Sequence, residues 1–306
     1  MLQLAELDRL VAKLPRRRIG FYPTPFHKLD NLSRRHGVNI FMKREDMAGP
    51  GAISGSKMRL AEFILGEALR QGIDTIITQG VYLTNSGMQL ATAARVAGIT
   101  PILYLTRDAG QGPVAEYRGN LLLSRIMDVE IRYVTTSGAA YWNATDERER
   151  IVNAMESHQA KLERQGHKVL IVPTGGAHPY GFVAHALTFI EAVRQASAMG
   201  VELDYIYHTA GTGTALPGML AAKLLTGHRV KFRSVAINSY RTEWMNKDVI
   251  VERVRQVFQA LDVETPVEDA RIHEEIDVDE RFIGKDYAVP SAEGAAAIKQ
   301  LARSDG

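Results

Sequence analysis

A lysine follows a glycine-rich stretch and directly precedes a run of residues with helical periodicity. The stretch Gly51–Arg59 reads GAISGSKMR, and LAEFILGEALRQG continues from Leu60. The amino group of Lys57 would lie near a helix N-terminus, where the positive end of the helix dipole disfavours the charged amine. A lysine whose pKa is lowered in this way can serve as a nucleophile or a base. The spacing alone fits a surface lysine in a capped turn at least as well, and it is not the GxxxxGKS/T spacing of a phosphate-binding P-loop.

Two further loops place glycines and small hydroxyl residues between an expected strand and an expected helix. The first, Gln79–Gly87, contains Thr84, Asn85 and Ser86, and helix capping alone could explain these residue types. The second, Thr209–Gly218, reads TAGTGTALPG and offers free backbone N–H groups and hydroxyls at a helix N-terminus. Such a place suits an anion, and a phosphate monoester is the obvious one. Its glycines do not follow the GxGxxG spacing, and a tight turn into a helix explains the pattern equally well.

The composition limits the classes of partner and chemistry. Among 306 residues, 37 Lys and Arg stand against 35 Asp and Glu, which gives no electrostatic reason to expect nucleic acid or an anionic membrane. The absence of cysteine excludes disulfides, thiolate metal sites and a cysteine nucleophile. The nine histidines do not form an HExxH pattern, and no metal site is expected. Without a signal-like apolar core or an apolar run of about 18 residues, we expect a cytoplasmic protein with no membrane contact.

The elements that must position the three loops alternate along the chain. Strand-like runs are Thr75–Thr78, Pro101–Leu105, Val129–Val134, Lys168–Val172, Tyr205–Thr209 and Val230–Ile237, and helical patterns cover Gly87–Val96, about Val114–Ile126, Asp146–Gln165, Tyr180–Met199 and Ala215–Leu225. This alternation predicts an α/β fold whose parallel sheets are built from βαβ units. Ligands of such sheets bind beyond the carboxyl ends of the strands, which is where the loops fall.

Seven segments, in order, resemble those of fold-type II pyridoxal-phosphate (PLP) enzymes of the D-cysteine desulfhydrase and 1-aminocyclopropane-1-carboxylate (ACC) deaminase family. The segments are Tyr22–Phe26 (YPTPF), Lys43–Asp46 (KRED), Gly55–Glu62 (GSKMRLAE), Gly80–Ser86 (GVYLTNS), Thr174–Gly181 (TGGAHPYG), Gly211–Met219 (GTGTALPGM) and Asp286–Pro290 (DYAVP). The resemblance runs from Phe21 to Gly306. It implies a two-domain, tryptophan synthase β-like fold with parallel-rich twisted sheets flanked by helices. Residues 1–57 and 164–306 would form the larger domain and residues 58–163 a smaller inserted one, with PLP between them in each subunit of a homodimer.

The resemblance also implies roles for single residues. Lys57 would hold PLP as the Schiff-base lysine and then transfer the substrate's protons, and Asn85 would hydrogen-bond the phenolic oxygen of the cofactor. Thr84 and Ser86 would bind the substrate carboxylate, and Tyr287 would lie beside the cofactor, where it shapes the pocket or assists proton transfer. The residues implied to bind the phosphate are Gly211, Thr212, Gly213, Thr214 and Ala215.

Three departures from the family pattern bear on the substrate. This sequence has Gly-Ser-Lys where the family usually has Gly-Asn-Lys, and Thr-Asn-Ser where the family usually has Ser-Asn-His. Ser86 therefore takes the place of a titratable histidine. The family continues past the segment LARSDG with Asp-Pro-Val-Tyr-Glu/Thr-Gly-Lys, which supplies the group facing the pyridine nitrogen, whereas this sequence stops at Gly306.

Three functions follow from the resemblance. The first hypothesis is a lyase that eliminates thiolate from D-cysteine or a related small amino acid and yields pyruvate, ammonia and sulfide. The second is ACC deaminase, which yields 2-oxobutanoate and ammonia. The third is a PLP-binding homologue with racemase activity or without lyase activity.

Overall fold

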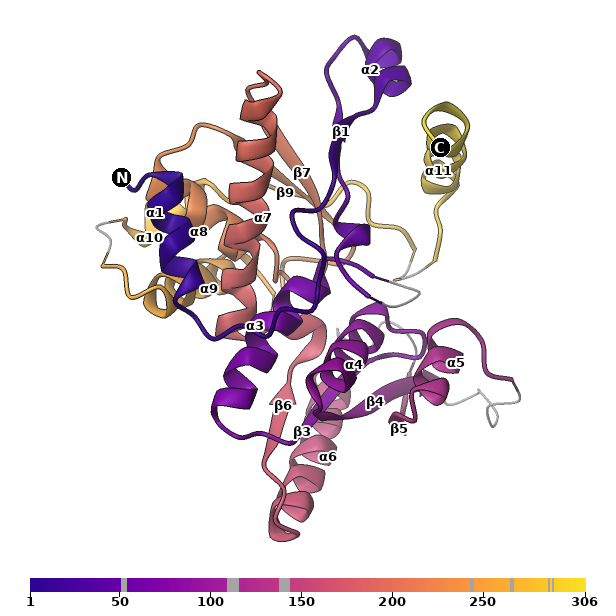
Figure 1. Ribbon diagram of the computed structural model, residues 1–306. Coiled ribbons are helices and arrows are strands. Elements are labelled where there is room, and N and C mark those ends of the chain that lie inside the picture. The colour runs from indigo at the N-terminus through magenta and orange to yellow at the C-terminus, as the bar shows by residue number, and fades with distance from the viewer. Residues whose placement is uncertain are drawn as a thin grey trace.

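The computed structural model describes residues 1–50, 54–108, 116–137, 144–242, 245–264, 267–285, 287 and 289–306 (Figure 1). The helices are α1 (Leu4–Ala12), α2 (Asp30–His36), α3 (Lys57–Arg70), α4 (Asn85–Ala97), α5 (Gly119–Ile126), α6 (Thr145–Arg164), α7 (Pro179–Ala198), α8 (Leu216–Thr226), α9 (Lys247–Ala260), α10 (Asp269–Glu274) and α11 (Ala292–Ser304), with short 3₁₀ turns η1 (Glu45–Met47) and η3 (Thr174–Gly176). The strands are β1 (Phe26–Lys28), β2 (Phe41–Lys43), β3 (Thr75–Val81), β4 (Thr100–Asp108), β5 (Glu130–Thr136), β6 (Val169–Val172), β7 (Tyr205–Ala210), β8 (Lys231–Ala236) and β9 (Val278–Asp279).

Four parallel strands form one sheet in the order β5-β4-β3-β6. Successive side chains of β4 point to opposite faces of this sheet, as the pleat requires. Ile102 packs with Ile151 of α6 on one face, and Leu103 packs with Ala91 of α4 and Leu121 of α5 on the other. Both faces are therefore covered by helices, which is typical of parallel sheets.

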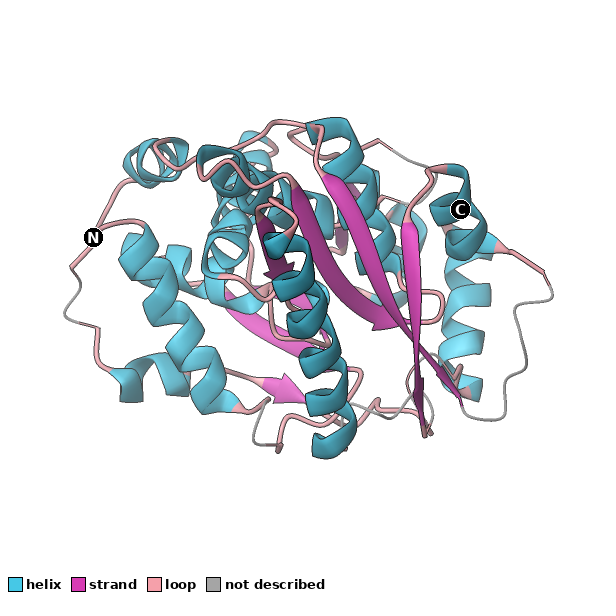
Figure 2. Ribbon diagram, turned by 90° about the horizontal axis from the view of Figure 1, so that it is seen from below, coloured by secondary structure: helices cyan, strands magenta, loops and turns pink. Residues whose placement is uncertain are grey.

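A second parallel sheet has the order β7-β8-β9, and α7, α8 and α9 pack beside it (Figure 1). Phe189 of α7 packs against Phe232 of β8 with ring centroids 6.2 Å apart. Helix α3 contacts α7 as well as α4, so it lies between the two sheets. Figure 2 shows helices on both sides of the strands. No helix in the described part of the chain is long and apolar enough to cross a membrane.

The structure confirms the α/β fold with parallel sheets, and most expected elements begin within a residue or two of their predicted positions. The helix expected from about residue 114 is an exception, because α5 begins at Gly119. Arg118 is extended (φ −133°, ψ 155°) and Gly119 has a φ of 51°, a value that residues with side chains rarely adopt. Residues 111–115 lie outside the described residues.

The division of the chain into residues 1–57 plus 164–306 and residues 58–163 stays a prediction. Strand β6 bears on it, because β6 pairs with β3 and thereby joins the sheet of β3, β4 and β5. That sheet therefore includes a strand that follows residue 163.

Candidate active site

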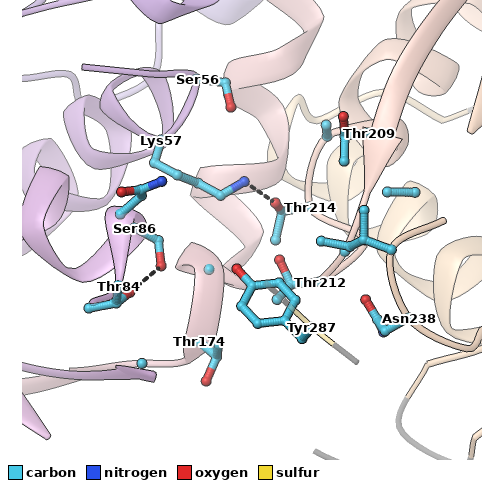
Figure 3. Close-up of a pocket in the computed structure, with 18 of the residues that line it drawn as sticks. Ser56, Lys57, Thr84, Ser86, Thr174, Thr209, Thr212, Thr214, Asn238 and Tyr287 are labelled. Carbon is cyan, nitrogen blue, oxygen red and sulfur yellow. Dashed lines mark hydrogen bonds between the residues drawn. The ribbon is translucent and has the colours of Figure 1, made fainter. Parts of the chain in front are cut away.

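A cavity of about 260 Å³ opens where strands of both sheets reach their carboxyl ends (Figure 3). Within three residues of these strand ends, the cavity is lined by Thr84 after β3, Thr174 after β6, Gly211 after β7 and Asn238 after β8. The cavity therefore lies at the edge that parallel α/β sheets use for ligands. It brings together every site residue named from the sequence: Lys57, Thr84, Asn85, Ser86, Gly211, Thr212, Gly213, Thr214, Ala215 and Tyr287.

Lys57 is the first residue of α3, and its side chain reaches toward the loop that follows β7 (Figure 3). Its Nζ donates a hydrogen bond to Oγ1 of Thr214 at 3.0 Å. Burial lowers the pKa of Lys57 to about 8. At pH 7 roughly one tenth of the amine is then uncharged, far more than for an exposed lysine with a pKa of about 10.4. The lowering was expected from the helix dipole, and the structure shows burial as its cause.

A buried ion-pair network fixes the first turn of α3. Nε of Arg59 lies 2.6 Å from Oε2 of Glu45, Nη2 lies 2.6 Å from Oε2 of Glu191, and the guanidinium stacks 4.1 Å from the ring centroid of Tyr22. The side chain of Arg59 is fully buried. Three of the family-like segments thus meet at one place, two residues from Lys57. They hold the helix that carries the reactive amine.

Residues at the start of α4 both cap the helix and line the cavity. Oγ1 of Thr84 accepts a hydrogen bond from the backbone N–H of Gly87 at 3.1 Å and lies 3.2 Å from Oγ of Ser86. Thr84 is therefore the helix cap that the sequence left open as an alternative. Either hydroxyl can be the donor of the hydrogen bond between Thr84 and Ser86, and both residues line the cavity.

The loop Gly211–Ala215 joins β7 to α8, and each of its residues lines the cavity. Gly213 has a φ of 61°, and a Cβ at this position would lie 2.7 Å from Cδ1 of Ile250. Both the backbone conformation and the space therefore require glycine. The loop approaches the cavity with its main chain rather than with bulky side chains.

Arg253 of α9 holds this loop from outside the cavity. Its Nη1 donates to the carbonyl oxygen of Thr212 at 2.6 Å and to that of Gly213 at 3.1 Å. In a trans peptide the N–H points opposite to the C=O. The N–H groups of Gly213 and Thr214 therefore point away from Arg253, and these residues line the cavity.

The charge of Arg253 has no counter-charge on the protein within the described residues. Arg255 on the same helix pairs with Asp269, whereas no carboxylate of the described chain lies within ion-pair distance of Arg253. Burial lowers the pKa of Arg253 to about 10, and the guanidinium remains charged at neutral pH. A buried cation of this kind is stabilised when an anion binds nearby.

Three helices begin at the cavity: α3 at Lys57, α4 at Asn85 and α8 at Leu216. Each contributes the positive end of a helix dipole and backbone N–H groups that have no partner within the helix. Such ends bind phosphate and carboxylate groups. The cavity can therefore receive an anion at more than one place.

Further titratable groups at the cavity, among them Tyr287 and His208, are neutral at pH 7. Burial raises the pKa of Tyr287, whose hydroxyl points to the side of the cavity where Lys57 and Ser86 lie (Figure 3). Burial also lowers the pKa of His208 to about 4, and the nearby charge of Lys57 acts in the same direction. The flanking residues 286 and 288, and residues 51–53 before the lysine loop, lie outside the described residues.

Several lining residues were not identified from the sequence: Ser56, Gln89, Thr174, His208, Asn238 and Tyr240. Asn238 could have been found, because it is the first polar residue after the strand expected at Val230–Ile237. His208 lies inside a strand and gave no such signal. Arg253 could not be connected to the loop, because about 40 residues of chain separate them.

These features fit PLP, the cofactor that the resemblance implies. A lysine amine with a lowered pKa lies across from the loop Gly211–Ala215, whose main chain lines the cavity at the N-terminus of α8, a place that suits a phosphate. A Cβ on Gly211 or Gly213 would lie 3.0 Å or less from Ile237 or Ile250, so the close packing of this loop behind the cavity depends on residues without side chains. Among the described residues, no cluster of His, Asp and Glu could hold a metal ion.

Residues 18–306 match the protein family described as "Pyridoxal-phosphate dependent enzyme". Among curated proteins, a 1-aminocyclopropane-1-carboxylate deaminase of Burkholderia vietnamiensis is 29% identical over 96% of this chain and 84% of its own length. Among solved structures, one described as an ACC deaminase homologue is 26% identical, covers 98% of this chain and 83% of that chain, and has a TM-score of 0.82.

A solved structure of a threonine deaminase shares the fold, with a TM-score of 0.52 over 76% of this chain and 63% of that chain at 21% identity. Together these likenesses confirm the fold-type II architecture and the cofactor expected from the sequence.

Proposed function

Because the chain belongs to the family of pyridoxal-phosphate dependent enzymes, we propose that it deaminates a small amino acid and that ACC is its substrate. The relatives named ACC deaminase support this choice. They reverse the order given by the sequence, which placed D-cysteine first. The homodimer implied by the resemblance stays a prediction.

The observation that carries the proposal is the position of Lys57. Its amine has a pKa of about 8 and reaches the loop Gly211–Ala215 across the cavity. An amine with this pKa can attach a carbonyl cofactor covalently and can accept or return a proton near neutral pH. PLP, when bound, supplies an electron sink for charge that develops on the substrate.

The remaining residues would bind and orient. Gly211, Thr212, Gly213, Thr214 and Ala215 would bind the phosphate through their N–H groups and hydroxyls. Asn85 would donate to the phenolic oxygen of the cofactor. Thr84 and Ser86, at the positive end of α4, would hold the substrate carboxylate. Tyr287 would lie beside the cofactor as a proton donor or as a wall of the pocket.

The second candidate is β-elimination from D-cysteine. The Thr84-Asn85-Ser86 segment favours it, because ACC deaminase activity uses a narrow set of residues and this segment departs from Ser-Asn-His at the place proposed for substrate binding. The two substrates make different demands on the site. D-cysteine has a hydrogen on Cα and ACC has none, so the group that takes the first proton must reach a different carbon in each case.

The test is to identify the product with each substrate. Protein loaded with PLP is incubated with ACC and, separately, with D-cysteine, and the oxoacid is identified by chromatography. ACC plus water gives 2-oxobutanoate and ammonia, and this is the expected result. Pyruvate with ammonia and sulfide from D-cysteine alone would select the second candidate. Bound cofactor with neither product would indicate the racemase or binding-protein alternative.

Two variants test the role of the lysine. Lys57→Ala should remove both the product and the visible absorbance band of covalently held PLP. Lys161→Ala, at an exposed position on α6, should retain both. A visible band that survives Lys57→Ala would overturn the assignment.

A further inference from the structure

Asn120 of α5 is buried beside the start of α4, where it contacts three hydrogen-bond acceptors. Its Nδ2 lies 3.0 Å from the carbonyl oxygen of Leu83, 3.2 Å from that of Thr84 and 2.6 Å from Oδ1 of Asn85. The side chain is only 6% exposed. One residue of α5 therefore contacts three consecutive residues at the edge of the cavity.

The chemistry of these groups fixes the orientation of both amides. Backbone carbonyls can only accept hydrogen bonds, so the atom of Asn120 that faces Leu83 and Thr84 must be its amide nitrogen. The atom of Asn85 that meets this nitrogen must then be the acceptor, Oδ1. Because an amide carries its NH₂ group on the other side of the same plane, Nδ2 of Asn85 is turned away from Asn120.

We propose that Asn120 is a positioning residue that presents the N–H donors of Asn85 to the cofactor. The inference rests on the proposed hydrogen bond from Asn85 to the phenolic oxygen of PLP. Asn85 lines the cavity, and its Oδ1 accepts a hydrogen bond from Asn120, which is not among the lining residues. Without Asn120 the side-chain amide of Asn85 can rotate by 180°. Its Oδ1, rather than its NH₂ group, would then face the phenolic oxygen of PLP.

A second observation supports the use of Asn120 as a donor. Its Oδ1 is buried and has no hydrogen-bond partner among the described residues. A buried acceptor without a partner is unfavourable, so an apolar side chain of similar volume would be the better fit if this residue served packing alone. The NH₂ group is the part of Asn120 that makes contacts.

The test compares two variants of Asn120 by cofactor affinity and by the absorbance spectrum of the bound cofactor. Asn120→Leu keeps the volume and removes the donor, and we expect PLP to bind about three- to tenfold more weakly, the effect of one hydrogen bond. Asn120→Asp offers only acceptors, so it draws the NH₂ of Asn85 toward α5. This variant should lose more affinity than Asn120→Leu and should shift the visible absorbance maximum, as we also expect of Asn85→Ala.

Gln159→Leu is the matched control. Gln159 belongs to α6, and its Nε2 also donates to a backbone carbonyl, that of Val169 at 3.0 Å. It should change neither affinity nor spectrum. In an Asn85→Ala background, Asn120→Leu should add no further loss of affinity.

The outcomes separate the inference from the proposal beneath it. If Asn85→Ala changes neither affinity nor spectrum, the role of Asn85 fails, and the inference with it. If Asn85→Ala changes both while the Asn120 variants change neither, only the inference fails. Equal losses from Asn120→Leu with and without Asn85 would make Asn120 a structural residue and would also overturn the inference.

Discussion

Arg253→Met separates the stability of the cofactor-free protein from its affinity for PLP. The variant removes two hydrogen bonds from a charged donor to the carbonyls of Thr212 and Gly213. Such bonds contribute about 1.5–3 kcal/mol each. The variant also removes a buried cation that forms no ion pair with a carboxylate of the described residues, and burial of such an ion costs several kcal/mol. Because these two effects oppose each other, the free energy of unfolding without cofactor should change by no more than about 2 kcal/mol.

The effect on PLP binding should be larger, because a bound phosphate compensates the charge of Arg253 and stabilises the loop that it holds. We expect a loss equal to one such hydrogen bond, about 1.5–3 kcal/mol, which is about a 10- to 150-fold rise in the dissociation constant. The assay is an absorbance titration of cofactor-free protein with PLP, together with urea unfolding of the same samples.

Two further variants complete this experiment. Arg255→Met removes an arginine of the same helix that also donates to a backbone carbonyl, that of Val267 at 2.6 Å, but pairs with Asp269 away from the cavity. It should leave PLP affinity unchanged. Arg253→Lys keeps the positive charge but lacks the planar set of N–H donors of the guanidinium group. Its affinity for PLP should lie between those of the wild type and Arg253→Met. Unchanged affinity in Arg253→Met would refute the argument that this residue supports the phosphate loop.

Three other perturbations test the site and its support. The rate at which cofactor-free protein takes up PLP covalently should rise with pH to a midpoint near 8, since only the uncharged amine of Lys57 attacks; a midpoint at the ordinary lysine value of about 10.4 contradicts the burial argument. Gly213→Ala should destabilise the protein by at least about 1–2 kcal/mol in thermal unfolding because its φ is 61°, and an unchanged melting temperature would mean that the loop relaxes. Arg59→Leu leaves Glu45 and Glu191 without their buried partner and should lower the free energy of unfolding by about 3–5 kcal/mol in urea; a loss below about 1 kcal/mol would show that the carboxylates find water instead.

The sequence predicted those features that depend on local pattern. The local pattern placed Thr84 and the loop after β7 at strand ends and Lys57 at the start of a helix, and the structure brings them to one cavity. The direction of the Lys57 pKa shift was also predicted, but its cause was not, because burial depends on segments more than a hundred residues away, such as the one that carries Thr214.

Contacts between distant segments could not be predicted. Asn120 lies 35 positions from Asn85, and Arg253 lies about 40 from the loop it holds, and neither pair leaves a local pattern in the sequence. The start of α5 was placed too early because residues before Gly119 have helix-compatible side chains, whereas the backbone of Arg118 is extended. Helix boundaries of this kind are set by the conformation of one or two residues.

The convergence of three helix starts on one cavity affects how mutational data for this protein should be interpreted. Main-chain amides are the same whatever the residue, so alanine scanning of Gly211–Ala215 removes the hydroxyls of Thr212 and Thr214 and leaves most of the anion-binding groups in place. Libraries selected for new substrates could change many cavity side chains and still retain the cofactor. The positions that resist replacement would then be Gly213 and Arg253, which set the path of the main chain and need not touch a substrate.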